Sequence, residues 1–147
     1  MNVPTRRTAV VVWLGILVTP LFFAAVTVVV APPPEMRSPE LAGMFFWMAA
    51  AVVGLGILLS RILPARIGKT GQGARDPVAF TRLTIAWAIL EGAALFPLVA
   101  QLVTGDPFQF LLTGVALAAL VGLFPSEARW ASHSVQPIEG LRNRLVR

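Results

Sequence analysis

The sequence contains no cysteine among its 147 residues and only one histidine, His133. The lack of cysteine excludes disulfides, thiolate metal sites and a cysteine nucleophile. A single histidine with no carboxylate clustered around it makes no metal site. Charged residues are also scarce, at 13% of the chain against about 25% in a soluble domain. We therefore expect no metal, no cofactor and no catalytic residue.

The remaining composition is that of a membrane protein. Hydrophobic residues make up 56% of the chain, and the mean hydropathy is +0.77. A net charge of +5 is compatible with nucleic-acid binding, but cytoplasmic loops of membrane proteins are also rich in Lys and Arg. Because the chain is so apolar, we assign the basic residues to such loops. We expect the lipid bilayer as a partner and no nucleic acid.

Four segments are long and apolar enough to cross a bilayer, which takes roughly 20 residues. In lipid a single span must satisfy its own backbone hydrogen bonds, so each segment is predicted to be helical. Prolines 32–34 end the first segment, a Gly-rich loop at 68–77 follows the second, and a tight turn at 104–107 joins the last two. The prediction is an all-α, polytopic protein with an antiparallel four-helix transmembrane domain over 1–125 (helices 9–31, 41–63, 80–103 and 108–125) and a tail at 126–147.

The distribution of basic residues predicts the orientation. With four spans, both tails and the second loop lie on one side of the membrane, and that side carries every Lys and Arg except Arg37. The positive-inside rule then places both termini in the cytoplasm. We expect an integral protein of a bacterial inner (plasma) membrane. The first segment exceeds the roughly 7–15 apolar residues of a signal peptide, so we interpret it as a span; cleavage after Ala31 would leave three.

Two further patterns predict surface contacts. The tail segment IEGLRNRLVR (138–147) is basic and amphipathic, which favours binding of anionic lipid at Arg142, Arg144 and Arg147. The fourth segment has small residues at every fourth position, which allow close helix–helix approach in lipid; these are Gly114, Ala118 and Gly122. This face either holds the four helices together or packs on another chain, in a homo-oligomer or a hetero-oligomeric complex.

Glu91 is the only carboxylate within the four predicted spans. An acidic residue at that depth costs about 2.5–3.5 kcal/mol, a cost that protonation, a hydrogen bond or an ion pair lowers. Gly92 and Ala93 beside it leave the backbone thinly covered, and Pro97 predicts a kink because it frees the Ala93 carbonyl. Glu91 is thus a candidate hydrogen-bonding lock to a neighbouring helix, a reversible proton-binding group, or one half of an ion pair with a partner chain.

The run EGAALFPLVAQL (91–102) resembles the ion-binding helix of the ATP synthase subunit c family, the rotor-ring proteolipids. Upstream, Gly73-Ala74-Arg75-Asp76-Pro77 resembles that family's polar Ala-Arg-Gln-Pro loop, and the similarity covers about 43–107. The resemblance implies that Glu91 is a proton carboxylate and that Arg75 and Pro77 form a cytoplasmic loop contact. The second segment departs from the family, because bulky Phe45, Phe46 and Trp47 stand where the family has a glycine-repeat helix.

These observations favour a small non-enzymatic membrane protein, because an enzyme would need a second catalytic group near Glu91. The first hypothesis is a structural or accessory subunit that assembles through small-residue helix faces, with Glu91 as a buried polar lock. The alternative is a proton-binding subunit resembling the rotor-ring proteolipid. A transporter would usually carry more polar groups inside the membrane than this chain does.

Overall fold

The computed structural model describes residues 5–30, 33–66 and 75–134, which form helices joined by short turns and contain no strand. The long helices are α1 (Arg6–Val29), α2 (Ala42–Arg66), α3 (Arg75–Thr104) and α4 (Phe108–Gly122). Two short 3-10 helices, η1 (Pro34–Met36) and η2 (Pro39–Leu41), connect α1 to α2, and α5 (Glu127–Ser134) follows α4. The prediction of an all-α chain is confirmed for the described residues.

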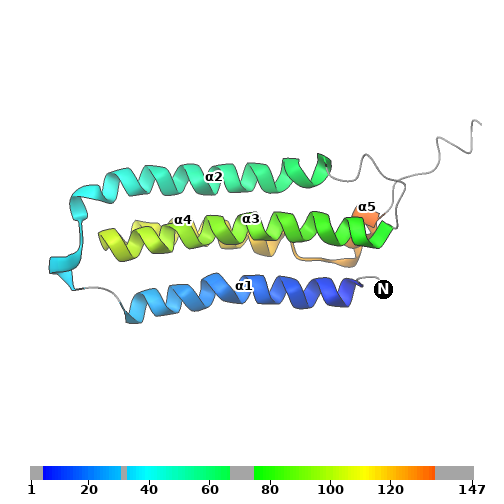
Figure 1. The fold of residues 1–147 in the computed structure, drawn as a ribbon, viewed down its shortest axis with the longest axis horizontal. Coiled ribbons are helices and arrows are strands. Elements are labelled where there is room, and N and C mark those ends of the chain that lie inside the picture. Colours follow the sequence, from blue (N-terminus) through cyan, green and yellow to red (C-terminus); the bar gives the residue numbers. More distant parts are fainter. Residues whose placement is uncertain (1–4, 31–32, 67–74, 135–147) are drawn as a thin grey trace, which may run out of the picture.

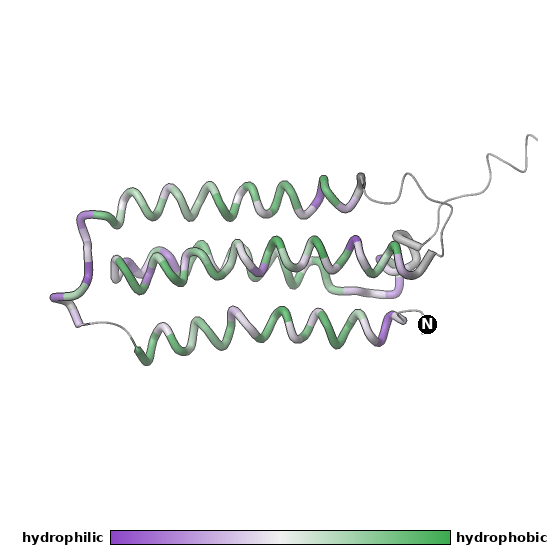
Figure 2. The backbone as a smooth tube through the Cα atoms, viewed as in Figure 1, coloured by the Kyte–Doolittle hydropathy of each residue, from purple (hydrophilic) through white to green (hydrophobic). Residues whose placement is uncertain are grey.

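Each long helix runs antiparallel to the one before it in the chain, and α3 lies between α1 and α2 (Figure 1). Helix α3 contacts α1, α2, α4 and α5, so it is the centre of the bundle. Half of its most apolar stretch is buried, against 17% in α1 and in α2. Hydrophobic residues cover the helices along their length and polar residues concentrate towards the ends (Figure 2). This pattern is typical of helices whose outer faces contact lipid.

Helices α1, α2 and α3 are long and apolar enough to cross a membrane, whereas α4 is a shorter apolar helix of 15 residues. At 1.5 Å per residue α4 is about 22 Å long, less than the roughly 30 Å of a hydrocarbon core. It ends at Gly122 rather than at the predicted Pro125. The reason is local, since the ring of a proline disfavours helical geometry in the residue before it.

Helix α3 begins at Arg75, five residues before the predicted start. Arg75 and Pro77 therefore stand in the first turn of a helix and not in the loop to which the sequence pattern assigned them. Proline is tolerated there because the first four N–H groups of a helix have no intrahelical acceptor. The sequence-based boundary was wrong because it followed the first long apolar run, which begins only at Phe80.

Two adjoining apolar clusters hold the bundle together. The first joins α1, α3 and α4 and consists of Ala9, Trp13, Leu83, Trp87, Leu90 and Leu120. The second joins α2, α3 and α4 and consists of Val53, Ala93, Ala94 and Ala116. At the end of the bundle where α3 ends, the Ser38 N–H donates a 3.0 Å hydrogen bond to the Val103 carbonyl and ties the 3-10 segment to α3.

Candidate functional site

Glu91 lies near the middle of α3 and is half-buried. It makes no hydrogen bond or ion pair with any other residue in the described ranges. Its neighbour Gly92 and the preceding Ala88 are exposed, as are Val99 and Val103, two and three turns beyond Gly92 on the same side of the helix. Positions three or four apart share a helix face, so Glu91 stands on the flank of an exposed stripe of α3. An internal lock through the Glu91 carboxyl is not formed within the described part of the chain.

Ala93, unlike its exposed neighbour Gly92, lies at the contact between α2 and α3. It is 3% exposed, and a methyl group placed on Gly56 of α2 would lie only 2.8 Å from its Cβ. The two backbones therefore approach closely at this point because neither residue carries a larger side chain. Gly56 was not singled out from the sequence, since one glycine among many in an apolar segment gives no distinguishing signal.

The small-residue face of α4 is on the surface of the bundle. Gly114, Ala118 and Gly122 are exposed, and a methyl group on either glycine would meet no atom within 4 Å. Gly92 of α3 has the same open surroundings. The alternative in which the α4 face packs inside the bundle is therefore wrong, because α4 turns its other side, with Ala116 and Leu120, towards α3.

Pro97 is fully buried, and α3 continues through it as a helix. Proline has no N–H, so the Ala93 carbonyl loses its intrahelical donor. The adjacent Ala94 carbonyl accepts a 3.4 Å hydrogen bond from the Thr113 hydroxyl of α4, which also lies 3.2 Å from the Gln109 carbonyl. A side chain of α4 thus meets the α3 backbone near the proline. A kink at Pro97 stays a prediction.

Two indole groups satisfy backbone carbonyls at the end of α4, where no sequence motif indicated a site. Trp13 of α1 donates from Nε1 to the Leu120 carbonyl at 3.1 Å, and Trp87 of α3 donates from Nε1 to the Leu123 carbonyl at 3.1 Å. The last four carbonyls of a helix lack the usual intrahelical donors, and in lipid each unsatisfied group is costly. The Leu120 carbonyl also accepts a 3.1 Å hydrogen bond from the Leu123 N–H, so Trp13 adds a second donor there, whereas Trp87 supplies the donor for the Leu123 carbonyl. These bonds tie the end of the short helix α4 to α1 and α3.

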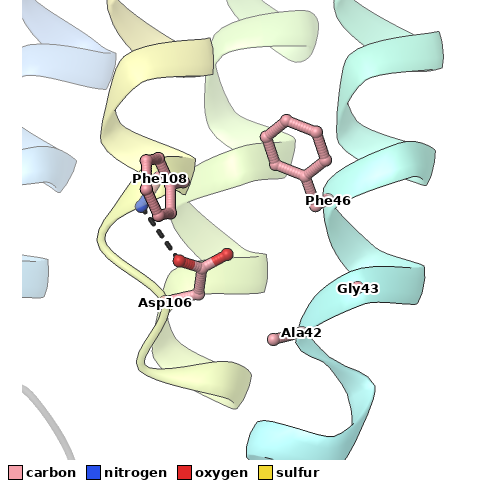
Figure 3. A pocket seen from close by; sticks show the side chains of 5 residues that line it. All are labelled: Ala42, Gly43, Phe46, Asp106 and Phe108. Atoms are coloured by element: carbon pink, nitrogen blue, oxygen red, sulfur yellow. Dashed lines mark hydrogen bonds between the residues drawn. The ribbon is translucent and has the colours of Figure 1, made fainter.

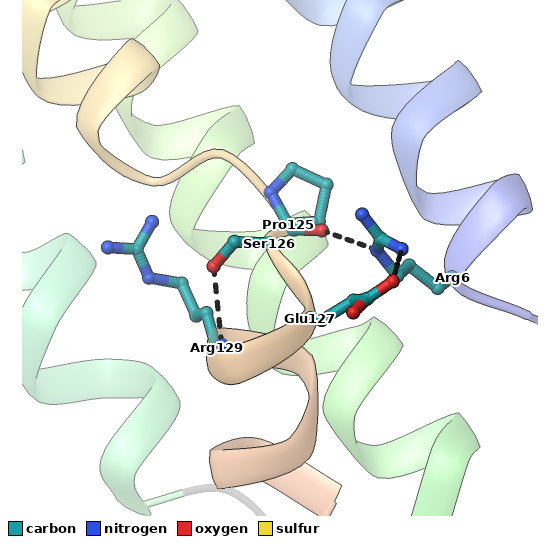
Figure 4. A network of polar contacts seen from close by, with 5 residues as sticks. All are labelled: Arg6, Pro125, Ser126, Glu127 and Arg129. Carbon is teal, nitrogen blue, oxygen red and sulfur yellow. Dashed lines mark hydrogen bonds and ion pairs between the residues drawn. The ribbon is translucent and has the colours of Figure 1, made fainter.

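Two arginines complete this set of contacts (Figure 4). Arg129 of α5 donates to the Gly122 carbonyl and, at 3.0 Å, to the Phe124 carbonyl. Arg6 of α1 donates to the Pro125 carbonyl at 3.1 Å and pairs with Glu127 at 2.7 Å. Cations near the negative end of a helix are also favoured by its dipole. The carbonyl-capping cluster, as we call it, is Trp13, Trp87, Arg6 and Arg129 with the carbonyls they bind.

Several buried polar atoms have no partner. Both amide atoms of Gln109, which is 0% exposed, make no hydrogen bond with the described residues, and the same holds for Gln101 Oε1 and Thr84 Oγ1. Gln109 starts α4 and Gln101 lies near the end of α3, on either side of the tight turn. No three His, Cys, Asp or Glu residues within the described ranges gather as metal ligands would.

A shallow pocket of about 400 Å³ lies where α2 and α4 begin (Figure 3). It is lined by Ala42, Gly43, Phe46, Asp106 and Phe108. Its one charged group is Asp106, and Oδ1 of that residue accepts a 3.0 Å hydrogen bond from the Phe108 N–H to start α4. The carboxylate thus satisfies the first N–H of α4, and the other residues that line the pocket are apolar.

The tail residues Arg142, Arg144 and Arg147 lie outside the described residues, as does the loop before Arg75. Comparisons with known proteins add no relative: no family model, no curated protein and no solved structure matches this chain. The candidate site therefore rests on its own geometry. It consists of Glu91 beside the open backbone at Gly92, and of the separate open face on α4.

Proposed function

We propose that this chain is a small non-enzymatic integral membrane protein, a structural or accessory subunit that assembles laterally through its small-residue helix faces. The observation that carries the proposal is the position of those faces. Gly92, Gly114 and Gly122 all lie on the surface with open space above them. Helix association in lipid depends on close packing of small residues, so an open glycine face is suited to a second helix.

Glu91 supports the same function. We place it as the polar contact of such an assembly, because it is half-buried in the central apolar helix and finds no partner among the described residues. Ionisable residues inside membranes generally pair with another group. The polar lock that the sequence suggested is thus assigned to a partner chain instead of to the bundle itself.

The proposed topology has four spans, with both termini cytoplasmic in a bacterial inner membrane. Helix α4 alone is too short, but the non-helical segment after it continues to Pro125, whose carbonyl binds Arg6 at the start of α1. The chain therefore returns to the level at which α1 begins. The helix bounds put several arginines towards that end, and they match a cytoplasmic side; these include Arg6, Arg7, Arg61, Arg82 and Arg129.

The test is the native mass of the particle extracted in a mild detergent. We expect a mass above that of the 15.7 kDa chain, from further copies or other polypeptides. Gly114→Leu and Gly122→Leu should each reduce that assembly because leucine blocks close approach. Gly15→Leu is the matched control, since Gly15 of α1 is also in open space. A particle of one chain, or an equal effect at Gly15, would overturn the proposal.

The second candidate is a proton-binding subunit, with Glu91 as the proton carboxylate. It is favoured by one observation, the partial exposure of Glu91 at mid-helix without a fixed partner in the described residues. A hydrophobic carbodiimide should then label Glu91, and Glu91→Gln should abolish labelling and proton uptake while the fold survives. Absence of labelling in native membranes would exclude this candidate.

A further inference from the structure

The exposed stripe of α3 forms an open face between two flanking helices. Helices α1 and α2 pack against α3 from either side (Figure 1), and the residues of α3 that remain exposed between them share one helix face. We call this the open face of α3; it consists of Thr81, Ala88, Gly92, Val99 and Val103. At Gly92 nothing lies within 4 Å of the position where a Cβ would stand, so another backbone can approach closely at the middle of the face.

Glu91 places a carboxyl group at the edge of this apolar face. It flanks the open face next to Gly92 and makes no contact with a cation in the described residues. The closest arginine along the helix, Arg82, is nine residues away, or about 13.5 Å at 1.5 Å per residue. The other arginines with described side chains lie towards the ends of the bundle, namely Arg6, Arg7, Arg37, Arg61 and Arg129.

A second copy of this chain is a poor occupant of the open face. A two-fold contact would bring the two Glu91 carboxylates towards each other, and like charges repel more strongly in a low dielectric. The copy also offers no arginine or lysine at mid-depth in its described helices. The charge of the face and the depth of Glu91 therefore select a different chain.

We propose that the open face of α3 binds a transmembrane helix of another protein that carries a lysine or arginine at the level of Glu91. This inference rests on the proposed function and names the kind of partner. The partner's basic residue pairs with the Glu91 carboxylate, and its backbone packs on Gly92. The pairing leaves neither ionisable group alone in lipid, and it fixes the register of the two helices.

The experiment uses cross-linking in native membranes from a single engineered cysteine, which is unique because the chain has none. Ala88→Cys on the open face carries a maleimide–benzophenone probe, and the cross-linked partner segment is identified by mass spectrometry. We expect a helix of another protein with a lysine or arginine within one turn of the attachment site. Glu91→Gln in the Ala88→Cys background should lower the cross-linking yield about tenfold.

Ala118→Cys on the exposed face of α4 is the matched control, and its cross-links should not depend on Glu91. Cross-links from Ala88 to lipid only, to a second copy, or to a helix without a nearby basic residue would overturn the inference. An unchanged yield with Glu91→Gln would do the same. Other polypeptides in the native particle could cross-link from Ala118 and not from Ala88. That result would support the proposed lateral assembly and overturn only the inference about the open face of α3.

Discussion

The indole N–H of Trp87 in α3 donates a 3.1 Å hydrogen bond to the carbonyl of Leu123, which follows the last residue of α4. Trp87 is 0% exposed, so water does not compete for this bond. Trp13 makes the corresponding bond to Leu120 from α1. Side chains of α1 and α3 thus bind the end of the shorter helix α4.

Trp87→Phe should lower the free energy of unfolding by about 1 kcal/mol, because phenylalanine keeps a ring in the core but leaves the Leu123 carbonyl without its donor. Trp13→Phe should cost less, because the Leu120 carbonyl keeps the Leu123 N–H as a donor. Trp47→Phe is the control, since Trp47 is 73% exposed on α2. The measurement is unfolding of the purified protein in detergent with increasing SDS. Equal stability of Trp87→Phe and Trp47→Phe would contradict the assignment.

Gly56→Ala should destabilise the contact between α2 and α3, because its new Cβ would lie 2.8 Å from the Ala93 Cβ. Gly54→Ala, two residues away, places its Cβ in open space and should be neutral or stabilising by up to about 1 kcal/mol through helix propensity. The pair differs only in which side of α2 receives a methyl group. Melting temperatures in detergent measure the difference, and the opposite order would argue against this helix register.

Gln109→Leu should raise the stability by about 1–3 kcal/mol, since it removes a buried amide whose atoms have no partner in the described part of the chain. Thr113→Val, one turn further along α4, should instead lower stability by about 0.6 kcal/mol because the Thr113 hydroxyl is hydrogen-bonded. Denaturation of both variants in the same detergent gives the comparison. A loss of stability in Gln109→Leu would show that the amide has a partner in the membrane.

Arg129→Ala should loosen α5 from the bundle, because the Gly122 and Phe124 carbonyls lose a charged donor at the negative end of α4. Faster proteolysis of α5 in detergent-solubilised protein would report this, and Arg129→Lys should restore part of the protection because the charge remains. Arg7→Ala is the control, as Arg7 is exposed at the start of α1. If Arg7→Ala accelerates cleavage equally, the effect comes from net charge and not from capping.

The turn at Thr104-Gly105 and the position of Glu91 were predictable from the sequence, whereas the contacts of Glu91 were not. Gly105 adopts a positive φ of +71°, as a glycine in a tight turn does, and the apolar runs on either side of this turn form helices as predicted. The position of Glu91 within α3 also followed from the sequence. Its lack of a partner within the described bundle did not, because a partner depends on which residues of other helices stand at its level.

Length and hydropathy alone were enough to predict that this chain is helical and has segments able to cross a membrane. Long apolar runs must bury their backbone hydrogen bonds internally in lipid, whatever their neighbours are. The packing of the helices was needed to see that Gly56 meets Ala93 while Gly114 stays open, and that Trp13 and Trp87 donate to carbonyls at the end of α4. These contacts join residues far apart in the chain, and helix rotation and packing set them, whereas local hydropathy does not encode them.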